Sequence, residues 1–324
     1  MDLQTNYLGL NLPNPFIVGA SPLVYDTDTA MRLEDAGAAA IVMHSLFEEQ
    51  LLRGHIRGFP DSDGTENYLA DEAREFPLHA DAYVEHLGHL KKRLSIPVIA
   101  SLNGLSEGTW TEYARLCADA GADAIELNFF FFPADMYESS SEMEERALYL
   151  IRAIVQQTSV PLSLKLSPFF TSLPHFLRHA EGAGAQGAVL FNRFFQPELD
   201  PSGPSWSPEI GVSSPDELRL RLNWMATLYG RSQMDFALSG GIHSHLDAIR
   251  AIMAGADAIQ VVSRILREGP ESLYTLLADV RLWMEANLYE DIGQLRGVAS
   301  FLNVDHPEAH ARASYFQLLK NWKS

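Results

Sequence analysis

The stretch AGADAIELN, residues 120–128, decides the fold of this chain. It joins the end of a helical pattern, closed by Ala-Gly-Ala, to a short apolar run that is typical of a strand buried on both faces. The same arrangement occurs again at AGAAAIVMH (36–44), GAGAQGAVLFN (182–192) and AGADAIQVV (254–262). A repeated order of helix, glycine and buried strand indicates parallel strands that are joined by helices.

Further apolar runs complete a set of eight predicted strands. Their predicted ranges are 15–20, 39–45, 96–102, 124–129, 161–167, 187–192, 235–239 and 258–263. Helical patterns lie between them, among others at 106–120, 142–158, 214–229 and 243–254. Eight alternating units without a change in composition predict an α/β fold, a (β/α)₈ TIM barrel in which residues 1–324 form a single domain.

Two kinds of segment stand outside this repeat. LQTNYLGLNLPN (3–14) predicts an N-terminal hairpin that closes the floor of the barrel. Residues 46–78 and 129–140 predict long loops over the C-terminal face, where barrel enzymes bind their ligands. A doubly wound open sheet is the alternative fold, but it would carry a G-x-G-x-x-G turn that GASPLV (19–24) lacks.

The charge balance excludes polyanionic partners. The chain has 324 residues and a formal net charge of −18, from 24 Lys and Arg against 42 Asp and Glu, without a basic cluster. Such a surface repels nucleic acid and anionic lipid membranes. No apolar run is long enough to cross a bilayer and the chain does not open with a secretion signal, so a cytoplasmic location is expected.

The strand PLSLKLSP (161–168) carries a lysine that a barrel has to accommodate. Alternation with a period of two turns the leucines toward the helices and Lys165 into the barrel. Burying an ammonium group without a partner costs several kcal/mol. Two interpretations remain open: an internal salt bridge with Glu126, which alternation also turns inward, or a lysine that faces a bound ligand.

Asn128 and Asn192 end two predicted strands on either side of Lys165. An asparagine amide offers two donors and one acceptor, which suits a ligand with amide or imide groups. A single asparagine at the end of a strand is most often a turn cap. Two of them beside Lys165 favour a binding role.

The last two predicted strands end in segments that suit a phosphate. Ser239-Gly240-Gly241 runs into a helix, and Ser263-Arg264 follows the eighth strand. Backbone N–H groups after these strands often bind phosphate in barrels, and an arginine can hold one with two hydrogen bonds. A phosphorylated cofactor or substrate is therefore predicted. No metal site is predicted, because His243 and His245 diverge on a helix.

Taken together, these segments resemble the class 1 dihydroorotate dehydrogenases, which are FMN-containing (β/α)₈ enzymes of pyrimidine biosynthesis. The resemblance rests on NYLGLNLPNPFIVGASP (6–22), IPVIASLNG (96–104), AIELN (124–128), PLSLKLSPFF (161–170), LFN (190–192) and the segment 238–266. It implies a flavin-dependent oxidoreductase acting on CH–CH donors, which converts dihydroorotate to orotate with noncovalently bound FMN. A small dihydropyrimidine-like substrate is implied, and the resemblance leaves room for a homodimer.

The resemblance also implies roles for individual residues. Lys165 would stand at the N1–C2=O edge of the flavin, where a cation stabilises the anionic reduced ring. The other cofactor-binding residues that it implies are Ala20, Ser21, Ser101, Asn103, Asn128, Gly211, Gly240, Gly241, Ser263 and Arg264. The substrate-binding residues that it implies are Asn67, Asn128 and Asn192.

Two positions depart from the family pattern. The loop after AIELN carries a Cys or Ser base in the family, whereas residues 129–134 read FFFFPA and contain no side chain that accepts a proton. A second lysine of the family is replaced by His44, whose ordinary pKa near ~6.5 makes it a candidate catalytic base beside Lys165. Losing a positioned base lowers rates by ~10²–10⁴, so orthodox activity on dihydroorotate is in question.

Other functions stay open from the sequence. A barrel that has lost both proton-handling residues could bind a flavin or another phosphate-bearing ligand without catalysis. A phosphosugar isomerase or lyase on the same fold would use Lys165 as a Schiff-base nucleophile. His44 could also replace the missing lysine only as a flavin contact.

Overall fold

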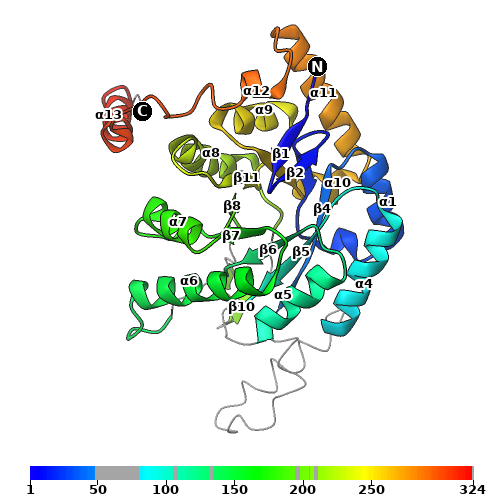
Figure 1. The fold of residues 1–324 in the computed structure, drawn as a ribbon. Coiled ribbons are helices and arrows are strands. Elements are labelled where there is room, and N and C mark those ends of the chain that lie inside the picture. Colours follow the sequence, from blue (N-terminus) through cyan, green and yellow to red (C-terminus); the bar gives the residue numbers. More distant parts are fainter. Residues whose placement is uncertain are drawn as a thin grey trace.

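The computed structural model describes residues 1–47, 80–104, 109–130, 134–193, 198–203, 205–207 and 211–322. Eight parallel strands close into a barrel in the order β11-β12-β3-β4-β5-β6-β7-β8. They are β3 (Phe16–Val18), β4 (Ala40–Phe47), β5 (Val98–Asn103), β6 (Ala124–Asn128), β7 (Leu162–Leu166), β8 (Gly187–Leu190), β11 (Asp235–Ser239) and β12 (Ala258–Val261). The predicted (β/α)₈ barrel is thus confirmed, with its strands at the predicted places (Figure 1).

Helices surround the barrel (Figure 1). They are α1 (Thr27–Asp35), α4 (Ala80–Arg93), α5 (Thr109–Asp119), α6 (Ser140–Gln157), α7 (Leu173–Gly182), α8 (Leu218–Leu228), α9 (His245–Ala254), α10 (Ser263–Glu268), α11 (Ser272–Ala286) and α12 (Ile292–Leu295). The last helix, α13 (Pro307–Lys320), stands apart from them. Two 3₁₀ turns are η1 (Pro22–Val24) and η2 (Pro215–Glu217), and two antiparallel pairs join β1 (Thr5–Tyr7) to β2 (Leu10–Leu12) and β9 (Glu198–Asp200) to β10 (Ser205–Ser207).

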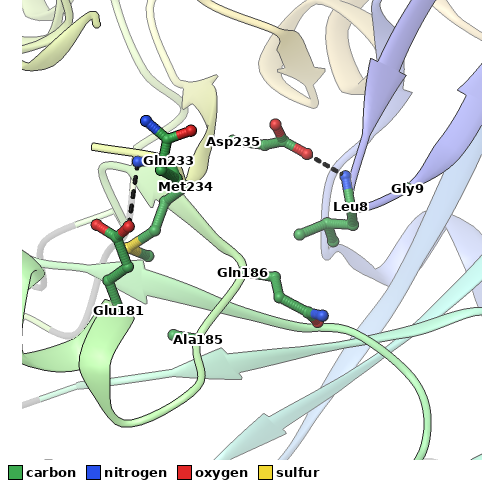
Figure 2. Close-up of a pocket in the computed structure, with 8 residues that line it drawn as sticks. All are labelled: Leu8, Gly9, Glu181, Ala185, Gln186, Gln233, Met234 and Asp235. Carbon is green, nitrogen blue, oxygen red and sulfur yellow. Dashed lines mark hydrogen bonds between the residues drawn. The ribbon is translucent and has the colours of Figure 1, made fainter. Parts of the chain in front are cut away.

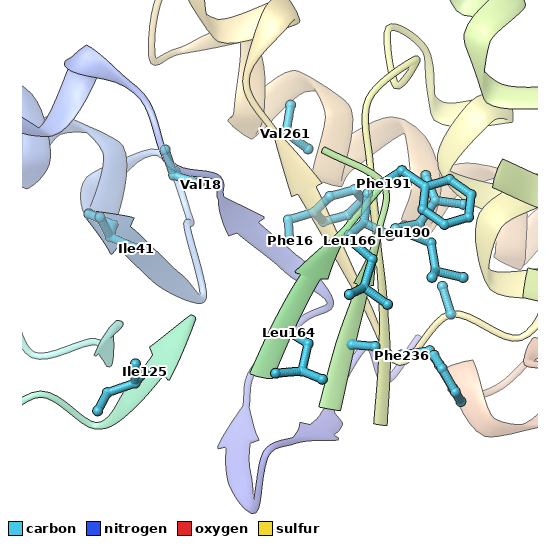
Figure 3. Close-up of a cluster of buried hydrophobic side chains, with 14 of the residues drawn as sticks. Phe16, Val18, Ile41, Ile125, Leu164, Leu166, Leu190, Phe191, Phe236 and Val261 are labelled. Atoms are coloured by element: carbon cyan, nitrogen blue, oxygen red, sulfur yellow. The ribbon is translucent and has the colours of Figure 1, made fainter. Parts of the chain in front are cut away.

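Side chains of the barrel strands alternate between the interior and the helical layer. Figure 3 shows Leu164 and Leu166 among the buried apolar side chains of the outer layer. Lys165, which lies between them in β7, contacts Gln260 of β12 across the barrel interior. The predicted inward direction of this lysine is therefore confirmed.

The N-terminal hairpin closes the floor of the barrel, as predicted. Tyr7, Leu8 and Leu12 are buried against inward-facing strand residues that include Val42. The Tyr7 hydroxyl also lies 2.9 Å from the Ser163 hydroxyl inside the barrel. The hairpin thus replaces water at the amino ends of the strands with packed side chains.

A hollow beside the hairpin lies at this floor (Figure 2). The Leu8 N–H donates to Asp235 at 2.6 Å, and the Gln233 N–H donates to Glu181 at 3.2 Å. Both carboxylates therefore satisfy backbone groups of neighbouring segments. Because barrel enzymes carry their sites at the other end of the strands, the floor serves closure of the fold.

The first predicted long loop falls largely outside the described residues, and the second only in part. The predicted start of the first loop at residue 46 is wrong, because β4 continues to Phe47 and pairs there with Asn103 of β5. The remainder of this loop from residue 48, and residues 131–133 of the second loop, are outside the described ranges. Among the helices that the structure describes, none is both long and apolar enough to span a membrane.

The closing role of the hairpin can be tested at Leu12, which is 1% exposed. Leu12→Ala removes buried apolar surface and leaves a cavity, so it is expected to lower the free energy of unfolding by about 2–5 kcal/mol. Urea unfolding followed by circular dichroism measures this change. Asn11→Ala, on the exposed side of the same strand, is the control, and equal stability of the two variants would contradict the closing role.

Candidate active site

A cavity of about 230 Å³ opens at the C-terminal ends of β3, β7, β8, β11 and β12. It lies at the end of the barrel where the sequence predicted a site. The predicted site residues that line it are Ala20, Ser21, Lys165, Asn192, Gly211, Gly240 and Ser263. Residues that are far apart in the sequence thus meet around one cavity because their strands end on the same face.

Lys165 is buried beside two polar side chains from other strands. Its Nζ donates to Gln260 Oε1 at 3.0 Å and lies 3.2 Å from Glu126 Oε1. Gln260 in turn donates through Nε2 to the other carboxylate oxygen of Glu126. The two interpretations of Lys165 are therefore compatible, since it forms the internal salt bridge with Glu126 and also lines the cavity.

The partners of Lys165 leave donors free for a ligand. An ammonium group has three N–H donors, of which Gln260 accepts one, while Glu126 Oε1 pairs with the charge without a hydrogen bond. The two partners also offset the cost of burying the charge, which a single weak contact could not do. The arrangement presents a fixed cation to whatever occupies the cavity.

Asn128 and Asn192 belong to one chain of hydrogen bonds. Asn192 Nδ2 donates to Asn128 Oδ1 at 2.7 Å, and Asn128 Nδ2 donates to Ser45 Oγ at 3.3 Å. Ser45 Oγ lies 2.8 Å from Ser101 Oγ. The chain crosses the ends of β8, β6, β4 and β5, so these polar groups form a continuous polar strip beside the lysine.

Gly240 and Gly241 form a tight turn at the end of β11, with φ angles of +93° and +81°. A Cβ on Gly240 would lie 3.0 Å from the Arg221 guanidinium, and one on Gly241 would lie 2.8 Å from the Leu218 nitrogen. Only glycine fits this turn, both for its backbone angles and for the space around it. The turn brings main-chain atoms to the edge of the cavity.

Hydroxyl groups surround the glycine turn. Ser213 Oγ accepts the Gly241 N–H at 3.0 Å and lies 2.7 Å from Ser263 Oγ. Ser21 Oγ is buried and has no hydrogen-bond partner among the described residues. Hydroxyls and main-chain N–H groups at a glycine turn are the donors that bind phosphate, so this end of the cavity fits an anionic group.

Arg264 does not line the cavity, in contrast to its predicted role at the phosphate. Its Nη1 donates to the His243 carbonyl at 2.7 Å, and its Nε lies 3.3 Å from Glu268. The guanidinium turns aside because α10 begins at Ser263 and places Glu268 one helical turn beyond Arg264.

Two further predicted site residues are Asn103 and Asn67. Asn103 is buried at the end of β5, and Asn67 lies outside the described residues.

His44 lies behind the strand rather than in the cavity. The register of β4 shifts between Val42 and Ser45, so Ser45 faces the asparagines while the His44 ring packs 4.1 Å from Tyr25 and 5.0 Å from Tyr83. Neither ring nitrogen has a hydrogen-bond partner in the described part of the chain. Burial lowers the pKa of His44 to about 3, which makes it a weak proton acceptor. Its catalytic role stays a prediction.

Sequence reasoning missed several residues around the cavity. Gln260 could have been found, because the alternation that turned Lys165 inward applies equally to AIQV in β12. Arg221 gave no such signal, since it comes from α8 and reaches the Ser239 carbonyl through tertiary packing, in addition to the Glu217 carbonyl at the start of its own helix. Burial lowers the pKa of Arg221, and its charge lies directly beneath the glycine turn.

The fold and the cavity define a class, a (β/α)₈ barrel with a polar, lysine-bearing site at its C-terminal face. The family model described as dihydroorotate dehydrogenase matches residues 58–284, more than half of the chain. The chain therefore belongs to the dihydroorotate dehydrogenase family, as its motifs indicated.

Individual relatives are distant but cover most of the chain. The catalytic subunit of dihydroorotate dehydrogenase B (NAD(+)) from Thermoplasma volcanium is 25% identical over 315 residues, covering 92% of this chain and 98% of the relative. A putative dihydroorotate dehydrogenase A (fumarate) from Aeropyrum pernix is 26% identical, covering 88% and 94%. The NAD-dependent dihydropyrimidine dehydrogenase subunit PreA from Escherichia coli is 23% identical, covering 92% and 77%.

The salt bridge between Lys165 and Glu126 can be tested by a double-mutant cycle. Lys165→Met leaves the Glu126 charge buried without its cation, so it is expected to lower the free energy of unfolding by about 3–5 kcal/mol. Adding Glu126→Gln removes that charge and is expected to restore most of the loss. Urea unfolding gives the four values, with Lys92→Met as the exposed control. Simple additivity of the two single changes would contradict the coupling.

Proposed function

We propose that this chain is an FMN-dependent oxidoreductase that acts on a CH–CH bond of a small dihydropyrimidine-like substrate. The observation that carries the proposal is Lys165, a buried cation fixed by Glu126 and Gln260, which lines the same cavity as the glycine turn at Gly240. A flavin mononucleotide has a ring that favours a cation and a phosphate that favours such a turn. The family membership agrees with this reading.

Residues that line the cavity or lie next to it would hold FMN. Gly240 and Ser263 would hold the phosphate, with Gly211 beside them, and Gly241 would support the turn because its N–H donates to Ser213. Ala20 and Ser21 would lie against the ring, where the unpartnered Ser21 hydroxyl would gain a hydrogen bond. Ser101 and Asn103 would lie below the ring on β5. Arg264 would not contact the phosphate directly, because its guanidinium donates to the His243 carbonyl. It would instead support the segment that surrounds the phosphate.

Lys165 would act electrostatically on the ring. Bound FMN supplies an acceptor for a hydride at its N5 atom, and reduction adds negative charge to the ring. The Lys165 ammonium, placed at the N1–C2=O edge, would stabilise that charge, and it would need no reorganisation because Glu126 and Gln260 already hold it.

The substrate would bind at the polar strip. Asn128 and Asn192 offer amide donors and acceptors that match a ring with imide groups and a carboxylate. Ser45 continues the strip, and Asn67 is expected to add a further amide from outside the described residues. The predicted domain, residues 1–324 around one FMN, stays a prediction.

The proposed reaction requires a proton acceptor. Oxidation of a dihydropyrimidine removes a hydride and a proton, and residues 129–134 provide no proton acceptor. His44 lies behind β4 with a pKa lowered to about 3 by burial. These two observations favour a second candidate function, a flavin-binding barrel without catalysis of dihydroorotate oxidation.

The phosphosugar isomerase or lyase predicted as an alternative has less support. A Schiff-base nucleophile has to be a neutral amine. Lys165 is instead held by Glu126 and Gln260, and attack on an aldehyde would have to break both contacts. Borohydride trapping with an aldehyde substrate would still detect such chemistry.

FMN binding is testable at the glycine turn. Gly240→Ala places a methyl group against Arg221 at a positive φ angle, so it is expected to weaken FMN binding at least tenfold. Quenching of flavin fluorescence during titration measures the affinity. Gly88→Ala is the matched control, because its new Cβ would meet no neighbour within 4 Å. Equal affinities in the two variants would place the phosphate elsewhere.

The two candidate functions differ in one kinetic experiment. Anaerobic mixing of the FMN-loaded protein with dihydroorotate, or with 5,6-dihydrouracil, is followed by the loss of flavin absorbance. The oxidoreductase proposal expects bleaching by at least one of the two compounds, and the binding-only alternative expects none. His44→Gln is expected to change the bleaching rate less than about twofold, because a weakly basic imidazole outside the cavity adds little. A tenfold loss would assign His44 the base role.

A further inference from the structure

The C-terminal helix α13 stands apart from the barrel, as Figure 1 shows. None of its residues is buried. It nevertheless carries large apolar side chains, which are Tyr315, Phe316, Leu318 and Leu319, with Trp322 following just beyond its end. An isolated helix of this length is only marginally stable in water, so exposed apolar groups on it indicate a missing contact.

The apolar side chains of α13 form one face. Tyr315, Leu318, Leu319 and Trp322 follow the i, i+3, i+4, i+7 spacing of a helix that packs along one side. The Trp322 N–H donates to the Leu319 carbonyl at 3.3 Å, which carries the helical turn on to the tryptophan. We call these four residues the α13 stripe.

The start of α13 is fixed to its own chain, and this directs the stripe outward. Arg231 donates to the carbonyls of Phe301 at 3.0 Å and Val304 at 3.1 Å, and the Phe301 ring contacts the His310 ring at 5.4 Å. From His310 to Trp322 the helix rises roughly 18 Å, at about 1.5 Å per residue. Within the described residues, its own barrel therefore leaves the stripe uncovered.

The charge of the C-terminal segment is opposite to that of the rest of the chain. Residues 307–324 contain three Lys and Arg (Arg312, Lys320 and Lys323) and one acidic residue (Glu308). Residues 1–306 contain the other 21 Lys and Arg and 41 Asp and Glu. A second copy of this chain therefore offers an acidic body that complements a basic, apolar helix.

One helix of the barrel has a matching surface. Among the described barrel helices, α11 is the one with two large exposed apolar side chains, Tyr274 and Leu282, two turns apart. The same helix carries two acidic residues, Asp279 and Glu285, and one basic residue, Arg281. The exposed surface of α11 thus offers apolar side chains to the α13 stripe and carboxylates to Arg312 and Lys320.

We propose that α13 docks its stripe on α11 of a second copy, and that the exchange is reciprocal. Each copy then gives one helix and receives one, which closes a dimer with twofold symmetry. The contact covers apolar side chains that the single chain leaves in water. This proposal does not depend on the bound cofactor or on the reaction.

Sedimentation velocity of the full chain tests the proposal. The wild-type protein is expected to sediment as a dimer in the micromolar range, and the double variant Leu318→Glu, Leu319→Glu as a monomer. Leu282→Glu on the receiving helix is expected to give the same loss. Leu220→Glu, on exposed α8 surface, is the control and should remain a dimer. Circular dichroism verifies that each variant is folded.

Two results would overturn the proposed interface. The first is a wild-type protein that is a monomer at every concentration, whatever else α13 then binds. The second is a dimer that persists in the α13 double variant, since the interface would then lie elsewhere. Loss of the dimer in the α13 variant but not in Leu282→Glu would reject α11 as the receiving surface.

Discussion

The contact between Lys165 and Glu126 inside the barrel is the interaction on which the site depends. A buried ammonium is tolerated only when it is paired and hydrogen-bonded, and here Glu126 and Gln260 meet that requirement from two other strands. The three side chains come from β6, β7 and β12, so the pairing requires a closed barrel with this strand order. The cation therefore has both of its partners only when the sheet is closed into a barrel.

The rest of the structure closes one end of the barrel and leaves Lys165 accessible only from the C-terminal face. The N-terminal hairpin fills the opposite end of the barrel, where the Tyr7 hydroxyl meets Ser163, two residues before Lys165 on the same strand. On the open face, Gly240, Ser213 and Ser263 of the glycine turn line the same cavity as Asn192 of the asparagine strip. A ligand with one anionic end and one polar ring would match this layout, as a flavin does.

The sequence predicted the structure correctly wherever a regular repeat of the pattern determines which way a side chain points or which element forms. Alternation placed Lys165 and Glu126 on the inner face, and the repeated helix, glycine and strand units gave the barrel itself. Alternation did not predict the directions of the side chains at the end of β4. The register of β4 shifts between Val42 and Ser45, so Ser45 points toward the asparagines and His44 points away from them. The sequence also did not indicate the contacts of Arg264 with Glu268 and the His243 carbonyl, which depend on where α10 begins, while its predicted role at a phosphate stays a prediction.

The reduction potential of bound FMN tests the central claim most directly. A fixed ammonium at the flavin ring favours the reduced, anionic form, so wild-type protein should hold FMN at a higher potential than the Lys165→Met, Glu126→Gln double variant, which removes both buried charges. Dye-coupled reduction under anaerobic conditions gives both values. Equal potentials in the two proteins, or a wild-type protein that binds no FMN, would contradict the assignment of this cavity to a flavin.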